Sequence, residues 1–308
     1  MQKRKIGLAL GSGSARGWSH IGVIRALQER GVEPDIVTGT SAGALVGALY
    51  ASGELDAFEK WIMQLEWKDV LGFLDLSFGS GIMKGQKLFN YLREHFKEQR
   101  IEDFSVPFAA VATEIDTGVE VWIQEGNALE AIRASLSLPG ILSPVYKEGK
   151  WLVDGGLVNP VPVSICRAMG AEVIIAVDLN HDLLLHKNNQ EEKKTQEREL
   201  RSLKENKNSI FDEARKYITS QFWGKEMRDE VRKEKTVEPS ILEVVNKSIS
   251  IMQLRITRSR MAGDPPDILL CPRLGHLGLM EYHRAEEAIA EGTRVVKKAE
   301  YLLQDILG

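Results

Sequence analysis

The sequence predicts an α/β protein with three layers (α/β/α), in which helices cover a mainly parallel central sheet. Two observations support this prediction. Short apolar segments alternate with segments of helical spacing from residue 5 onward, and such alternation is typical of strand–helix units whose strands are parallel. Glycines stand at the junctions between these segments, where the chain has to turn sharply.

The amino-terminal segments establish this alternation. We expect a buried strand at residues 5–10 (KIGLAL) and then a helix at residues 20–31 (HIGVIRALQERG) that ends at its glycine. A second strand at residues 35–39 (DIVTG) leads directly into a helix at residues 41–53 (SAGALVGALYASG). The small side chains of this second helix allow it to lie very close to the sheet.

The pattern continues to the end of the chain, with one interruption. Further strands are expected at residues 107–115, 119–126, 150–154, 171–180 and 267–274, and further helices at residues 58–67, 85–96, 127–140, 241–261 and 281–307. Residues 181–238 are dense in charge and predict a solvated, largely helical insertion. The catalytic core is expected at residues 1–180, and residues 239–308 are expected to complete the same domain.

Composition excludes several classes of protein. The formal net charge of −4 gives no reason to expect a nucleic acid partner. Cys166 and Cys271 both stand in apolar sequence, which indicates reduced thiols in a cytoplasmic protein rather than a disulfide or a metal site. The first apolar run is too short for a signal peptide, and residues 42–51 are too few to span a bilayer. Transient contact with a membrane surface remains open.

The first candidate site is GTSAG, from Gly39 to Gly43, which matches G-x-S-x-G. The match falls between a predicted strand and a predicted helix, where the glycines allow a sharp corner that leaves the Ser41 hydroxyl free. The N–H groups at the start of the helix favour negative charge that develops there. Ser41 is therefore a candidate nucleophile, although so short a pattern also arises by chance in a chain with 27 glycines.

The second candidate site is GSGSARG, residues 11–17, between the first strand and the first helix. It does not fit the dinucleotide pattern G-x-G-x-x-G, because Arg16 stands where the third glycine is needed and no acidic residue ends the second strand. Backbone N–H groups around Gly13 and Ser14, with Arg16 behind them, would instead bind an oxyanion. A plain helix-capping turn is the alternative.

The third candidate site is Asp154, which ends an apolar strand and is followed by Gly155 and Gly156. Asp-Gly is common in turns, but a carboxylate at a strand end can also act as general base to a serine. A Ser–His–Asp triad of the α/β-hydrolase type would need a later histidine, and the candidates are His181, His186, His276 and His283. None stands in a distinctive motif, so a Ser–Asp dyad is the simpler alternative.

Together the three motifs resemble those of the patatin-like phospholipase family. That family has a glycine-rich oxyanion loop with an arginine, then G-x-S-x-G, and then D-G-[GA] more than a hundred residues later. Here these are GSGSARG, GTSAG and DGG. The segment AIRASLSLPGILSPV is similar to the family's active-site lining, and the tail from residue 267 is similar to that of the compact bacterial RssA-type group. The resemblance covers residues 5–180 and extends past the insertion.

The resemblance implies a patatin-like fold, a Ser41–Asp154 dyad without histidine, and no metal or organic cofactor. Ser41 would be the nucleophile and Asp154 the general base, acting on a fatty-acyl ester of a phospholipid or lysophospholipid, or on another acyl ester. The oxyanion hole would consist of Gly11, Ser12, Gly13 and Ser14, with Arg16 nearby. Two of these residues, Ser12 and Ser14, depart from the family's glycine run. The alternatives are a triad esterase and a non-catalytic adaptor with the patatin fold.

Three further segments bear on lipid access and partners. Residues 70–85 (VLGFLDLSFGSGIMKG) are either a lid over an acyl pocket or ordinary packing. Arg255, Arg258 and Arg260 on the long carboxy-terminal helix either meet lipid headgroups or form a solvated face. Residues 187–238 of the insertion could bind a protein partner or a second copy of the chain.

Overall fold

The computed structural model describes residues 4–65, 86–95, 98–183 and 241–307. The chain divides into two compact units, Met1–Leu183 with Val245–Gly308, and Leu184–Val244. The description below concerns the first unit. The predicted lid at residues 70–85 and residues 184–240 of the predicted insertion lie outside the described residues, so the roles assigned to them stay predictions.

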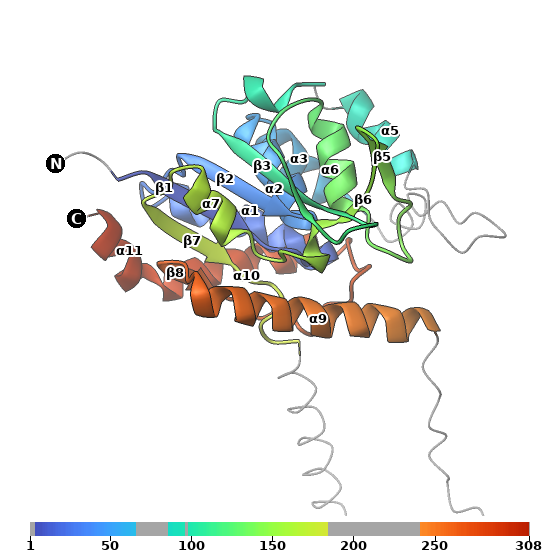
Figure 1. The fold of residues 1–308 in the computed structure, drawn as a ribbon. Coiled ribbons are helices and arrows are strands. Elements are labelled where there is room, and N and C mark those ends of the chain that lie inside the picture. The colour runs from blue at the N-terminus through green and yellow to red at the C-terminus, as the bar shows by residue number, and fades with distance from the viewer. Residues whose placement is uncertain (1–3, 66–85, 96–97, 184–240, 308) are drawn as a thin grey trace, which may run out of the picture. The chain divides into compact units, whose positions relative to one another are not determined.

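An eight-stranded sheet forms the centre of the described unit (Figure 1). Its middle strand β1, Ile6–Leu10, is flanked by β2, Ile36–Thr40, and β7, Val173–Val177, both parallel to it. The parallel part continues with β3, Phe108–Glu114, on one side and β8, Ile268–Leu270, on the other. The antiparallel strands are β4, Glu120–Ile123, β5, Val145–Lys147, and β6, Lys150–Asp154. The predicted parallel sheet is confirmed, with an antiparallel edge added.

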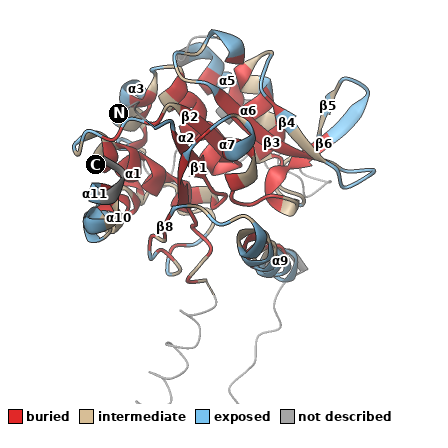
Figure 2. Cartoon of the chain, turned by 60° about the vertical axis from the view of Figure 1, so that its left-hand side comes forward, coloured by how far each residue is buried: buried red, intermediate tan, exposed pale blue. Residues whose placement is uncertain are grey.

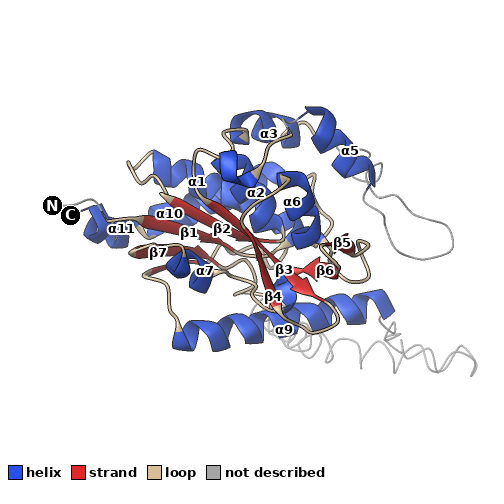
Figure 3. Cartoon of the chain, turned by 45° about the horizontal axis from the view of Figure 1, so that its top comes forward, coloured by secondary structure: helices blue, strands red, loops and turns tan. Residues whose placement is uncertain are grey.

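Helices cover both faces of this sheet, as predicted (Figure 3). The strand β1 shows why, because Leu8 and Leu10 pack into a large apolar cluster while Ala9 packs into a separate cluster with Cys166. A strand that is buried on both faces is apolar along its whole length. The large cluster includes residues of α1, Ser19–Gln28, α2, Ala42–Ala51, α3, Leu55–Ile62, α5, Gln86–His95, α6, Ala128–Leu136, and α10, Ala285–Lys298. The smaller cluster involves α7, Val163–Ala168.

The carboxy-terminal segment differs in detail from the prediction. The expected closing helix is two helices, α10 and α11, Glu300–Leu307. The long helix α9, Ile241–Gly263, agrees with the prediction, but its arginines do not share one role. Arg255 and Arg258 are exposed, whereas Arg260 donates to the Val158 carbonyl at 2.8 Å and pairs with Glu120. The face of Arg255 and Arg258 is thus solvent-exposed, and Arg260 behind them is held by Glu120 and Val158.

Both cysteines are free thiols. Burial raises the pKa of Cys166 and of Cys271 to about 12, so both are protonated at neutral pH. No helix in the described ranges is long and apolar enough to cross a bilayer.

The helices α1 and α10 cross at two glycines. A Cβ on Gly22 would lie 1.9 Å from the Ile289 carbonyl oxygen, and one on Gly292 would lie 2.0 Å from the Ser19 carbonyl oxygen. We expect Gly22→Ala to lower the free energy of unfolding by about 2–4 kcal/mol, because two backbones have to separate. Urea denaturation measures the loss. The control is Gly263→Ala, since a Cβ there meets nothing within 4 Å; equal stability of the two variants would contradict the prediction.

Candidate active site

Ser41 occupies a sharp corner between β2 and α2. Its backbone has φ 56° and ψ −120°, a conformation that costs a residue with a side chain about 1–3 kcal/mol. The corner closes because Gly39 and Gly43 lack side chains: a Cβ on Gly39 would lie 2.3 Å from the Gly43 carbonyl oxygen. The Ser41 N–H donates to Ser135 Oγ on α6 at 2.8 Å. This hydrogen bond holds the strained residue in place.

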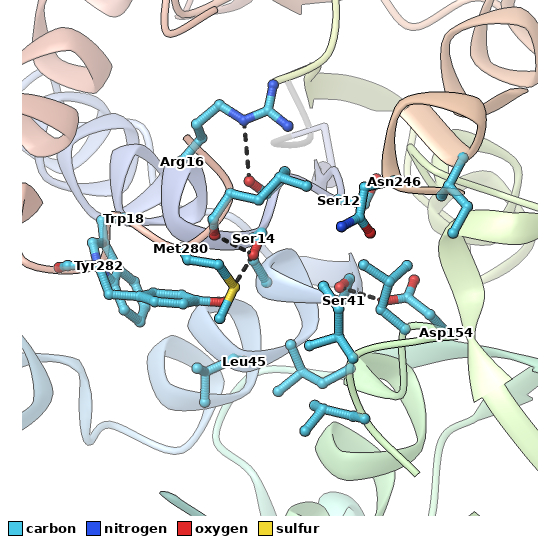
Figure 4. Close-up of a pocket in the computed structure, with 18 of the residues that line it drawn as sticks. Ser12, Ser14, Arg16, Trp18, Ser41, Leu45, Asp154, Asn246, Met280 and Tyr282 are labelled. Carbon is cyan, nitrogen blue, oxygen red and sulfur yellow. Dashed lines mark hydrogen bonds between the residues drawn. The ribbon is translucent and has the colours of Figure 1, made fainter. Parts of the chain in front are cut away.

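Asp154 lies at the end of β6 and contacts Ser41 directly (Figure 4). The Ser41 hydroxyl donates to Asp154 Oδ2 at 2.6 Å, and the Gly156 N–H donates to Asp154 Oδ1 at 2.7 Å. The Thr113 hydroxyl donates to the Asp154 carbonyl at 2.9 Å. Both carboxylate oxygens are therefore occupied, and the side chain is held in one orientation. The sequence prediction that these two residues work together is consistent with this geometry.

The electrostatics of Asp154 suit a base. Burial raises the pKa of its carboxyl to about 6, and the hydrogen bonds from Ser41 and Gly156 oppose that rise. The group is 1% exposed. Its pKa lies closer to neutrality than that of an ordinary carboxyl, so it is ionised at pH 7 yet basic enough to accept a proton from a serine.

The glycine-rich loop offers fewer donors than the sequence predicts. The Gly11 N–H donates to the Val177 carbonyl at 3.0 Å and the Ser12 N–H to the Pro160 carbonyl at 2.8 Å, so both are used by the fold. Among the hydrogen bonds of the described residues, none uses the N–H of Gly13 or Ser14. Both residues line the same cavity as Ser41. The prediction that the N–H groups of Gly11 and Ser12 bind an oxyanion is therefore wrong, while those of Gly13 and Ser14 stay candidates for that role.

The two serines of this loop tie it to the carboxy-terminal segment. Ser14 has φ 52°, in the region that favours glycine, and its hydroxyl bonds the Leu279 carbonyl at 2.7 Å and the Tyr282 hydroxyl at 2.8 Å. The Ser12 hydroxyl donates to Gln253 Oε1 at 3.2 Å. Ser12 and Ser14 stand where the family pattern has glycines. Their hydroxyls form hydrogen bonds with residues more than 200 positions later in the chain.

Arg16 supports the loop from behind. Its side chain is 1% exposed, and its three nitrogens donate to the Gly13 and Leu179 carbonyls and to Asn180 Oδ1. Burial lowers the pKa of Arg16 to about 10, and the nearby Asp182 and Asp178 oppose that fall. The guanidinium is charged and holds the carbonyl of Gly13, so its contribution to the site is through the shape of the loop.

No histidine of the described residues lines the cavity that contains Ser41 and Asp154. His20 is buried in α1, where its Nε2 lies 2.8 Å from the Gly11 carbonyl oxygen, and burial lowers the pKa of its ring to about 4. His276 contacts Glu287 on the surface. His186 lies outside the described residues.

The cavity above the dyad has a volume of about 130 Å³ and is mainly apolar (Figure 4). Its apolar lining comes from η1 (Ser14–Trp18), from α2, α3, α6 and α9, and from the segments around residues 65, 140 and 280; the residues are Trp18, Ala42, Leu45, Phe58, Trp61, Leu65, Leu136, Leu138, Ile141, Leu142, Ile249, Leu279 and Met280. Such a lining suits a hydrocarbon chain. No group of residues that could hold a metal ion occurs in the described part of the chain.

Several residues of this site carry no signal in the sequence. Ser135, Asn180, Gln253 and Tyr282 stand in no motif, and they reach the site only through the packing of α6, β7, α9 and the segment before α10. The spacing of polar residues in one sequence does not distinguish these four residues from surface positions. Their conservation among homologues is the signal that would.

A serine on a sharp strand-to-helix corner, bonded to a buried carboxylate beneath an apolar cavity, is the architecture of a serine acyl hydrolase. Residues 8–167 match the patatin-like phospholipase family. An uncharacterised NTE family protein of Mycobacterium bovis is 33% identical, and the match covers 96% of this chain and 91% of that protein. The chain therefore belongs to the patatin-like phospholipase family, whose members are lipid acyl hydrolases.

Two further similarities are more limited. Patatin-like phospholipase domain-containing protein 6 of Homo sapiens is 39% identical over 182 residues, which are 56% of this chain but 13% of that protein. The crystal structure of VipD from Legionella pneumophila aligns with a TM-score of 0.45 and 13% identity, covering 100% of this chain and 79% of that one. The second similarity is too low to bear on function.

Proposed function

We propose that this protein hydrolyses fatty-acyl esters of phospholipids or lysophospholipids through a Ser41–Asp154 dyad. The observation that carries the proposal is the 2.6 Å hydrogen bond from Ser41 Oγ to Asp154 Oδ2, beneath a cavity with an apolar lining. Membership of the patatin-like phospholipase family supports a lipid ester as the substrate.

The proposed reaction has two steps. Asp154 accepts the Ser41 proton as Oγ attacks the acyl carbonyl, and the N–H groups of Gly13 and Ser14 stabilise the oxyanion. The proton then passes to the leaving alcohol, and an acyl-serine remains. In the second step Asp154 accepts a proton from water as the water oxygen attacks the acyl carbon, and the proton then passes to Ser41 Oγ as the bond from the acyl carbon to that oxygen breaks and the fatty acid leaves. In this reaction Ser41 supplies the nucleophile, Asp154 the base, and Gly13 and Ser14 the N–H groups that donate to the oxyanion.

The direct test combines labelling with hydrolysis. A fluorophosphonate is expected to label wild-type protein at Ser41, and a panel of phospholipids and lysophospholipids is expected to release fatty acid. Ser41→Ala should abolish both signals, because it removes the nucleophile. Folded wild-type protein that takes no label and cleaves none of the lipids would favour the adaptor alternative.

The pH dependence follows from Asp154. We expect kcat/KM on an uncharged ester to rise as the pH increases through about 6 and to level off above that value, because only the ionised carboxyl can accept the serine proton. Initial rates between pH 4 and pH 8 measure this profile. A profile that is flat down to pH 4 would contradict the assignment of Asp154 as the base.

The triad alternative makes a different prediction. An enzyme with a catalytic histidine loses several powers of ten in rate when that histidine is replaced. If Ser41 and Asp154 act as a dyad, each histidine-to-alanine variant should instead keep a rate within about twofold of wild type. The variants to compare are His181→Ala, His186→Ala, His276→Ala and His283→Ala. A large loss in any folded variant would favour the triad.

A further inference from the structure

Apart from the dyad, the glycine-rich loop and Tyr282, the polar residues that line the cavity lie on α9. Asn246, Ser250 and Gln253 all line the cavity, and their spacing of four and three residues places them on one side of the helix. Ile251 and Met252 are exposed and lie on the other side of the helix, and Figure 2 colours much of α9 as exposed. The cavity therefore has an apolar wall suited to an acyl chain and a polar edge on α9.

The orientation of the Gln253 amide is determined by a chain of hydrogen bonds that starts at a cation. Arg16 can only donate, so Asn180 presents Oδ1 to it at 3.2 Å. Asn180 Nδ2 consequently faces the other way and donates to Gln253 Oε1 at 3.3 Å, and the Ser12 hydroxyl donates to the same oxygen. Because Oε1 receives both bonds, Nε2 points away from Asn180 and Ser12.

Gln253 Nε2 lies beside the base. The position that a Cβ would take on Gly156 is 2.3 Å from Gln253 Nε2 and 2.9 Å from Asp154 Oδ1, so both atoms adjoin the same point. Gln253 is 7% exposed, and among the hydrogen bonds of the described residues none uses Nε2. Asn246 Oδ1, two turns earlier on α9, is a buried atom without a hydrogen-bond partner among the described residues. Buried polar atoms without partners cost free energy unless a ligand pairs with them.

We propose that Asn246, Ser250 and Gln253 form a subsite for the alcohol half of the ester, and that Gln253 Nε2 donates a hydrogen bond to an oxygen of that alcohol. This inference rests on the proposed hydrolase function. The alcohol it requires carries a hydroxyl on the carbon next to the ester, as glycerol does, whether or not a phosphate is attached to the carbon after that. Asn246 Oδ1 accepts from a hydroxyl of the same alcohol.

The position next to Asp154 indicates the alcohol rather than the acyl chain. As Ser41 Oγ bonds to the acyl carbon, the bond from that carbon to the alcohol oxygen breaks, and the proton taken up by Asp154 moves to that oxygen. The leaving oxygen therefore has to approach Asp154. A donor beside Asp154 meets the alcohol in this step, while the acyl chain occupies the apolar wall.

The test compares esters of one fatty acid with three alcohols: ethanol, glycerol, and the glycerophosphocholine of a lysophospholipid. In Gln253→Met we expect kcat/KM for the two glycerol-containing esters to fall about tenfold or more relative to the ethyl ester, the loss of about one hydrogen bond. Disturbance of the oxyanion loop would lower all three rates alike and leave their ratios unchanged. Both glycerol-containing esters, acylated at the first glycerol carbon, have a free hydroxyl on the carbon next to the ester, so the fall should be similar for the two.

Two further variants sharpen the comparison. Gln253→Glu keeps the oxygen that accepts from Ser12 and Asn180 but loses the Nε2 donor, so the same fall in the ratios is expected. Ser248→Ala changes an exposed residue of α9 and should keep the wild-type ratios. Unchanged ratios in both Gln253 variants would overturn the subsite.

A measurement without turnover separates this proposal from the hydrolase function. A 1-O-alkylglycerol has no ester to cleave, and it should raise the midpoint of thermal unfolding of wild-type protein more than that of Gln253→Met, because it binds the folded state more tightly when the donor is present. Equal shifts would overturn the subsite even if hydrolysis is active. Absence of hydrolysis with unequal shifts would overturn the hydrolase function and leave the binding site standing.

Discussion

Replacing Asp154 with Asn is expected to lower kcat/KM by about 10²- to 10⁴-fold, the usual contribution of a positioned general base. The amide cannot take the Ser41 proton, although it has nearly the same shape and can keep the hydrogen bond from Gly156. Initial rates on one lipid ester, at pH 8, measure the loss. A variant that retains more than a tenth of the wild-type rate would refute the dyad.

The same variant provides its own control for folding. The pKa of Asp154 rises from 3.8 to about 6 on folding, so the folded state disfavours its ionised form. Ionised Asp154 therefore lowers the free energy of unfolding. This loss of stability is absent below about pH 4, where the carboxyl is protonated in both the folded and the unfolded state. It grows between pH 4 and pH 6 and is complete above pH 6. That difference corresponds to about 3 kcal/mol. We therefore expect Asp154→Asn to be more stable than wild type at pH 8 and not at pH 4, as urea denaturation would show.

Gly43→Ala is expected to damage both the fold and the site. A Cβ at this position would lie 2.1 Å from the Leu10 carbonyl oxygen and 2.8 Å from the Gly11 carbonyl oxygen, and neither backbone group can rotate away. The start of α2 has to move from β1, at a cost of about 3 kcal/mol or more. A displacement of about 1 Å between nucleophile and base costs about 10² in rate, so the folded fraction should also be nearly inactive.

Gly47→Ala is the matched control for this substitution. Gly47 lies one turn further along α2, where a Cβ would be 3.0 Å from a methyl group of Val37. A side chain can adjust by a few tenths of an ångström, and alanine favours a helix interior by about 1 kcal/mol over glycine. We expect Gly47→Ala to stay folded and active. Comparable losses in both variants, by urea denaturation and by initial rates, would show that α2 tolerates no added volume anywhere.

The described site joins parts of the chain that are far apart in sequence. Ser41 and Asp154 come from the first 160 residues, whereas Gln253, Leu279 and Tyr282 come from the segment after residue 240. These later residues form hydrogen bonds with the Ser12 and Ser14 hydroxyls of the glycine-rich loop. The N–H groups that we propose for the oxyanion, those of Gly13 and Ser14, belong to the same loop. A protein truncated before residue 240 would leave the Ser12 and Ser14 hydroxyls without these partners.

The sequence by itself determined the main fold and singled out Ser41 and Asp154, the two residues that we propose as the reacting groups. Apolar strands alternate with helical segments, which predicts the parallel strands around β1. Ser41 and Asp154 were predicted because the glycines around them mark tight corners at strand ends, and such corners depend on local backbone geometry. The division of α10 from α11 was not predicted, since the helical spacing of the residues continues across it.

Only the tertiary structure decided which groups are available for chemistry. GSGSARG shows several N–H groups, but the carbonyls of Val177 and Pro160 occupy those of Gly11 and Ser12. The sequence around Arg260 shows no partner for it, yet its guanidinium pairs with Glu120. Gln253 carried no signal, yet it lies beside Asp154. The reason is the same in each case. Each partner or neighbour is about a hundred residues or more away in the sequence, so its position depends on how the strands and helices pack and not on the local sequence.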